Sequence, residues 1–188
     1  MITGHLGIAA AAHATRRDSS LVWLLGASMA PDVVDGLFVV ARSCNPYGLY
    51  SHTLPAAALI AAVMGAAAYL ATGTRSTGLL AALLVLAHVP LDFVTGYKLF
   101  WPGGELSGLR LYNQPAADFV LESLLATAGW WTIRARPWAP RWATTWTALA
   151  ALLLVQGAMD IAGKARGGVK PSSCARPAAL AAPAAPLP

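Results

Sequence analysis

The side chains in this sequence best suited to chemistry are His88 and Asp92, four residues apart in an apolar stretch. Residues at positions i and i+4 share one face of an α-helix, with Cβ atoms about 5–6 Å apart. One helix could therefore present an imidazole and a carboxylate to the same metal ion. The same spacing recurs with two carboxylates at Asp118 and Glu122.

Further acids and histidines lie in or beside apolar stretches, among them Asp32, Asp35, His52 and His5. A carboxylate at the centre of a bilayer costs about 2.5–3.5 kcal/mol, so such residues usually pair, face water or bind a ligand. Like charges one helical turn apart repel each other, and burial strengthens the repulsion. A divalent metal ion is the simplest cation to balance these acids. Mixed His, Asp and Glu ligands favour Zn²⁺, with Mn²⁺ or iron as alternatives.

Simpler explanations stay open for individual residues. His5 and His52 could lie at the level of the lipid headgroups. Asp118 could stabilise the N-terminus of its own helix, where a negative charge is favourable. His88 and Asp92 could form a buried hydrogen bond without metal, although ionisable pairs rarely lie in membrane spans without a function.

The composition predicts an all-α integral membrane protein. The chain has 188 residues, of which 57% are hydrophobic and 11% are charged, and its mean hydropathy is +0.57. Soluble domains contain about 25% charged residues. The net charge of +5 does not indicate nucleic acid, because the Lys and Arg residues lie in short loops between apolar runs. There they set topology and contact anionic headgroups, so we expect membrane lipids as partners.

Hydrophobic stretches predict about five transmembrane helices plus a short N-terminal interfacial helix. The expected spans are residues 20–41, 52–72, 76–100, 115–133 and 143–163. At 1.5 Å per residue, the apolar segment 3–15 is too short to cross a hydrocarbon core of about 30 Å. Residues 1–163 are therefore expected to form one helical membrane domain. The Ala- and Pro-rich residues 164–188 are expected to be a disordered tail.

Short motifs along the chain resemble those of a known family. They are Gly4-His5, Pro31-Asp32, Ser51-His52-Thr53, and His88-x-x-x-Asp92 followed by Thr95-Gly96 and Trp101-Pro102. Their order over about residues 3–122 is similar to that of the bacterial inner-membrane metal-dependent hydrolases of the YdjM type, which are distantly like zinc-dependent phospholipase C enzymes. The resemblance implies a multi-pass protein of the bacterial inner (cytoplasmic) membrane.

The resemblance also implies a set of metal ligands, namely His5, Asp32, His52, His88 and Asp92. Asp35 is a further candidate metal ligand that matches a second family acid less closely, because the family usually places that acid two positions after the first and this chain places it three. The family often has a further histidine shortly before the Ser51-His52-Thr53 motif, whereas this chain has Tyr47 and Tyr50 there.

These observations predict a membrane-bound metal-dependent hydrolase that acts on a phosphoester or lipid-linked ester through a metal-activated water. Glu122 or Asp118 is the candidate general base. Lys98 and Arg110 are candidates to hold an anionic group of the substrate. Two other functions stay open. One is a small proton- or ion-coupled membrane transporter, because intramembrane acids and histidines also form proton relays. The other is a non-catalytic membrane scaffold whose helices a metal only staples together.

Overall fold

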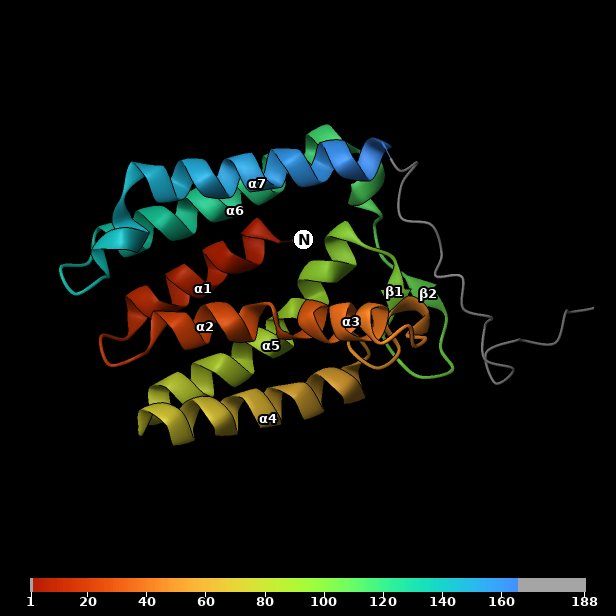
Figure 1. Ribbon diagram of the computed structural model, residues 1–188, viewed down its shortest axis with the longest axis horizontal. Helices are drawn as coiled ribbons and strands as arrows, with labels where there is room; N and C mark the ends of the chain where they lie inside the picture. Colours follow the sequence, from red (N-terminus) through yellow and green to blue (C-terminus); the bar gives the residue numbers. More distant parts are fainter. Residues whose placement is uncertain (1, 166–188) are drawn as a thin grey trace, which may run out of the picture.

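The computed structural model describes residues 2–165 and is mostly helical (Figure 1). Its helices are α1 (Thr3–Thr15), α2 (Leu21–Ser28), α3 (Ala30–Val40), α4 (Leu54–Thr72), α5 (Arg75–Thr95), α6 (Pro115–Arg134) and α7 (Trp146–Ala165). Three short 3₁₀ turns, η1 (Pro46–Gly48), η2 (Leu111–Asn113) and η3 (Arg141–Thr144), lie between them. Of the tail predicted to be disordered, residues 164–188, the structure places Lys164 and Ala165 in α7, and residues 166–188 lie outside the described residues.

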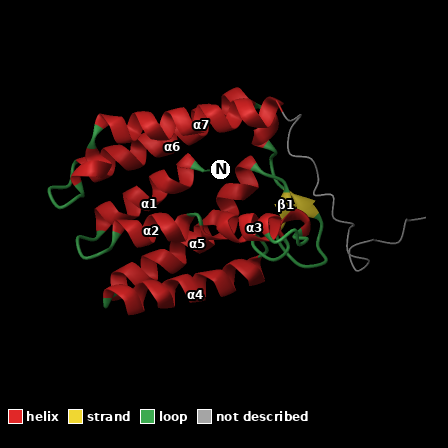
Figure 2. Ribbon diagram, in the orientation of Figure 1, coloured by secondary structure: helices red, strands yellow, loops and turns green. Residues whose placement is uncertain are grey.

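The long helices run roughly side by side in layers, with α6 and α7 at one side, α4 and α5 at the other, and α1 and α2 between them (Figure 1). Within the described residues, the strands form a single small hairpin at one end of the bundle (Figure 2). Its strands β1 (Lys98–Leu99) and β2 (Leu106–Ser107) are antiparallel, with Lys98 opposite Ser107.

Small side chains allow the helices to approach closely at the centre of the bundle. Ala9 of α1, Ala27 of α2, Ala61 of α4 and Ala81 of α5 are buried in one hydrophobic cluster. Without a large hydrophobic driving force between helices in lipid, such close van der Waals packing is a main source of association. This packing holds α5, which contains two of the predicted metal ligands, against α2 and α4.

The predicted span at residues 20–41 is broken into α2 and α3, which are bent by 57° relative to each other. Pro31 lies in the first turn of α3. Proline has no backbone N–H to donate to the preceding turn, and its ring clashes with the carbonyl four residues earlier. The helix therefore cannot continue straight through Met29. The break leaves backbone carbonyls of α2 open to other donors, and one of them contributes to the site described below.

Two helices, α4 and α5, are long and apolar enough to cross a membrane, and the bent pair α2 and α3 gives a third candidate span. The prediction of five spans is therefore not supported within the described residues. The carboxylates of Asp118 and Glu122 interrupt the apolar sequence of α6. The described apolar part of α7, Trp146–Ala162, falls short of the about 20 residues that a span needs.

The first helix is short, as predicted, with 13 residues. However, α1 packs in the interior of the bundle, between α6 and α2, rather than along its outside (Figure 1). Glycines explain this position, because Gly7 of α1 and Gly129 of α6 bring the two backbones into direct contact. A side chain at either position would overlap the facing helix. The interior position of α1 brings His5 to the metal ligands predicted on other helices.

Candidate metal centre

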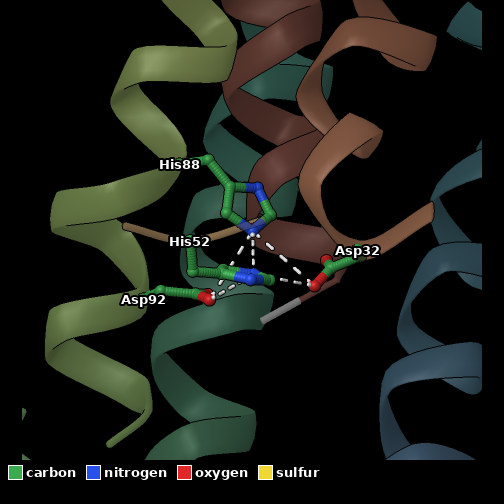
Figure 3. Close-up of side chains that lie close together, drawn as sticks. All are labelled: Asp32, His52, His88 and Asp92. Atoms are coloured by element: carbon green, nitrogen blue, oxygen red, sulfur yellow. Dashed lines mark hydrogen bonds and ion pairs between the residues drawn. The ribbon is translucent and has the colours of Figure 1, made fainter. Parts of the chain in front are cut away.

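Four of the predicted ligand residues, Asp32, His52, His88 and Asp92, come together in space (Figure 3). Each offers one donor atom, and the four donor atoms lie within 4.8 Å of one another. His88 and Asp92 lie one turn apart on α5, Asp32 is in the first turn of α3, and His52 precedes α4. The helix break at Met29 and the turn before α4 thus place Asp32 and His52 beside the two ligands of α5.

The donor separations match those around a single metal ion. Nε2 of His52 lies 3.2 Å from Nε2 of His88, 3.4 Å from Oδ1 of Asp32 and 3.1 Å from Oδ2 of Asp92. Nε2 of His88 lies 3.6 Å from the same oxygen of each carboxylate. Tetrahedral coordination at the usual Zn–N and Zn–O distances places neighbouring donors about 3.3 Å apart. The residues present therefore fit a metal ion of this size.

Burial differs among the four ligands. His52, His88 and Asp92 are at most 3% exposed, whereas the side chain of Asp32 is 31% exposed. Three donors are therefore fixed in the interior of the bundle, and the group is accessible from the side of Asp32.

The ring of His88 is oriented by the helix break. Its Nδ1 lies 2.9 Å from the backbone carbonyl oxygen of Ser28, the last residue of α2. In a continuous helix this carbonyl would accept the N–H of Asp32, four residues later. A histidine that donates Nδ1–H to a carbonyl keeps the lone pair on Nε2, the nitrogen that faces the group. The break therefore supplies both Asp32 and the acceptor that sets the tautomer of His88.

The ring of His52 is supported on its other side by Ser51 and Asp35. Its Nδ1 lies 2.7 Å from Oγ of Ser51 and 3.4 Å from Oδ2 of Asp35. Asn45 and Ser51 both hydrogen-bond to Asp35. Carboxylates in this position fix the ring and raise the basicity of a metal-binding histidine. Asp35 thus lies behind His52 and outside the four-residue group, although the sequence placed it among the ligands.

His5 lies against the group without belonging to it. Its ring stacks on that of His88, with centroids 3.9 Å apart and an angle of 28° between the planes. His5 is 1% exposed. The structure therefore places His5, which was predicted to be a ligand, against the face of the His88 ring.

Of the two cations predicted to bind substrate, the structure brings Lys98 to the site. The β1–β2 hairpin places its Nζ 2.8 Å from Nε2 of His52, 3.1 Å from Oδ2 of Asp92 and 3.6 Å from Oδ2 of Asp35. Arg110 instead lies with its guanidinium carbon 3.5 Å from the centroid of the Tyr97 ring.

The candidate general bases are buried on α6, and the structure does not bring them into the four-residue group. Oε2 of Glu122 accepts hydrogen bonds from the backbone N–H groups of Ile2 and Gly4, at 3.0 and 3.1 Å. Asp118 lies one turn earlier on the same helix and is 1% exposed. Glu122 therefore contacts the beginning of α1.

Some residues of the site were not identified from the sequence as functional. Ser51 belongs to the Ser51-His52-Thr53 motif, so the sequence shows that it is adjacent to His52. Asn45 lies in the loop before η1, where no periodic pattern marks it. The carbonyl of Ser28 belongs to the backbone, so no residue type could indicate it.

Comparison with known proteins supports the family resemblance that the sequence motifs indicated. No curated protein and no solved structure matches the chain. A family model described as "YdjM inner membrane protein" matches residues 1–163. The match includes the whole candidate metal centre and the apolar helices α4 and α5. The chain therefore belongs to the YdjM inner membrane protein family and is a membrane protein.

Proposed function

We propose that this protein is a membrane-bound metal-dependent hydrolase whose metal ion is held by Asp32, His52, His88 and Asp92. The main support is the convergence of these four donor atoms within 4.8 Å, in a protein with apolar helices that can cross a membrane. Zn²⁺ is the first candidate, because it accepts mixed imidazole and carboxylate donors and can expand from four to five ligands, so that a water could bind beside these four side chains. Mn²⁺ and iron accept the same donors.

The charges at the site favour a divalent cation. Asp32, Asp35 and Asp92 bring three negative charges, and Lys98 brings one positive charge. With both histidines neutral, two negative charges are left in a largely buried cluster. Unpaired buried charges are costly. A metal ion of charge +2 would leave the cluster neutral.

The protein would orient the reaction through these side chains. A metal ion bound here would supply the Lewis acidity that makes water nucleophilic at neutral pH. The Ser28 carbonyl and the Asp35 carboxylate hold the rings of His88 and His52, so their Nε2 atoms stay directed at one point. The partial exposure of Asp32 leaves one side of the centre open to a substrate.

A phosphoester or a lipid-linked ester is the substrate class that we propose. The ammonium of Lys98 lies beside the ligands, where it can pair with an anionic oxygen of the substrate. The surface formed by sequence neighbours of these residues has an open apolar hollow of about 390 Å³. Its lining residues flank His52, His88, Asp92 and Lys98 in the sequence, namely Leu54, Val89, Pro90, Phe93 and Phe100. An apolar surface at this place favours a substrate with an acyl or isoprenoid chain.

The proposal is tested by metal content and then by turnover. Plasma mass spectrometry on detergent-purified protein should find about one equivalent of Zn, Mn or Fe in the wild type and none in His88→Ala. His13→Ala is the matched control, because His13 is also buried but hydrogen-bonds to Ser19 in the loop after α1. The loaded wild type should then hydrolyse phosphoesters or lipid esters in mixed micelles. Metal without turnover would support the scaffold instead, and a wild type without metal would support the transporter.

A further inference from the structure

We infer that Glu122 is a positioning residue of the metal centre, which fixes the beginning of α1 so that His5 stays stacked on His88. The inference rests on the metal site of the proposed function but does not require hydrolysis. It gives Glu122 a different role from that of a general base.

Glu122 caps a helix to which it does not belong. The first N–H groups of an α-helix have no partners within the helix and need acceptors from elsewhere. At the beginning of α1, Ile2 provides no side-chain cap. Oε2 of Glu122, on α6, instead accepts the N–H groups of Ile2 and Gly4, and Oγ1 of Thr3 lies 3.2 Å from it. A carboxylate at this end of a helix is also favoured by the helix dipole.

The cap acts on a helix that is already pressed against α6. A Cβ atom at Gly7 would collide with the backbone of Leu125 and Ala126, and one at Gly129 would collide with the backbone of Gly7. This contact sets the distance between the two helices near the middle of α1. Glu122 adds a second attachment at the end of α1 where His5 lies. Two attachments along one helix fix its direction as well as its distance.

The position of α1 affects the metal ligand His88 through the ring of His5. It directly follows Gly4, whose N–H is bonded to Glu122 at 3.1 Å. Its ring covers the ring of His88 at a centroid distance of 3.9 Å. The ring of His88 is thus held by a hydrogen bond at Nδ1 and by a stacked neighbour on its face. If α1 shifts at its beginning, His88 loses the stacked neighbour and gains freedom to turn away from the metal.

The expected effect is a loss of metal affinity. Mutation of residues that orient a metal ligand typically costs about 10–100-fold in affinity. Glu122→Ala and His5→Ala should each weaken metal binding by about that factor. If Glu122 acts through His5, the double variant should bind metal no more weakly than His5→Ala alone, because the two changes then remove the same support.

The experiment is a competition titration with Zn²⁺ and a chromophoric chelator on the full-length protein in detergent. The wild type, both single variants and the double variant are compared, together with His13→Ala. His13 is a matched control, because it is buried on α1 but lies at the other end of that helix and hydrogen-bonds to Ser19. His13→Ala should keep the wild-type affinity even if its unfolding temperature falls.

Two results would overturn the inference while leaving the proposed function intact. One is a wild-type Zn²⁺ affinity in Glu122→Ala. The other is independent, additive losses in the double variant. A wild type that binds none of Zn²⁺, Mn²⁺ and iron would overturn both. If Glu122→Ala does not fold, Glu122→Gln takes its place. The glutamine keeps one acceptor oxygen without the charge, so its affinity should lie between those of the wild type and His5→Ala, and a wild-type value would count against the inference.

Discussion

Nε2 of His52 lies 3.2 Å from Nε2 of His88, although the two residues are 36 positions apart in the chain. Each ring has an acceptor beside its Nδ1 atom, the Ser28 carbonyl for His88 and Ser51 with Asp35 for His52. When both Nδ1 atoms donate their hydrogen, both Nε2 atoms present lone pairs to each other. Two lone pairs at this separation repel unless a cation lies between them. The backbone and the carboxylate behind the rings therefore prepare the pair for a metal ion.

Asp92→Asn should abolish metal binding, because the change keeps the shape of the side chain but removes a charge from a ligand that is 3% exposed. The loss should exceed the about 10–100-fold that changes around the ligands cost. Metal content after purification measures it.

Asp18→Asn is the control for this change. The side chain of Asp18 is exposed, and a hydrogen bond from Ser76 lowers the pKa of its carboxyl. Full metal retention in Asp92→Asn would show that this carboxylate is not a ligand.

Asp35→Asn should separate a supporting carboxylate from a ligand. Asp35 faces Nδ1 of His52 rather than the point where the four donors meet. The variant should therefore still bind one metal ion, with affinity lower by about 10–100-fold. Asp32→Asn, in the same helix, should lose the metal altogether. Equal losses in the two variants, measured by the same Zn²⁺ titration, would return Asp35 to the ligand set that the family resemblance implied.

The sequence predicted the parts of the site that depend on local spacing. The helical face shared by His88 and Asp92 follows from four residues of separation. The meeting of this pair with His52 and Asp32 depends on contacts between helices far apart in the chain. No spacing rule gives those contacts, and the family resemblance alone indicated them. The role of the Ser28 carbonyl depends on the break near Met29, whose direction Pro31 does not specify.

The five predicted spans exceed the candidate spans of the described residues for a physical reason. Apolar length alone does not register the buried acids Asp118 and Glu122 in α6, and the carboxylate of Glu122 belongs to a polar contact between α6 and the start of α1. The same contact explains why Glu122 looked like a catalytic group. A buried carboxylate in an apolar helix needs donors, and the sequence does not show that backbone N–H groups of α1 supply them.

Lys98→Met should affect metal binding and substrate binding in opposite directions. The ammonium of Lys98 lies 2.8 Å from Nε2 of His52 and 3.1 Å from Oδ2 of Asp92. A cation beside the ligands repels a metal ion and weakens its binding, so removal of this charge should raise the Zn²⁺ affinity. It should also raise KM for an anionic substrate, because the charge that pairs with the substrate is lost. Lys98→Arg should preserve most of the wild-type KM. A lower Zn²⁺ affinity in Lys98→Met would identify Lys98 as a support of the ligands.

Gly129→Ala should destabilise the protein far more than Gly26→Ala, although both glycines lie inside helices. A Cβ atom at Gly129 would collide with the backbone of Gly7, which cannot move aside as a flexible side chain would, whereas a Cβ atom at Gly26 meets nothing within 4 Å. Overpacking typically costs about 1–3 kcal/mol. At Gly26, alanine should be neutral or stabilising by up to about 1 kcal/mol, because it favours the helix. Thermal unfolding in detergent measures both.

Since α1 holds His5 against His88, Gly129→Ala should also weaken Zn²⁺ binding. If Gly129→Ala unfolds at the wild-type temperature with unchanged Zn²⁺ affinity, the two helices do not pack as closely as described.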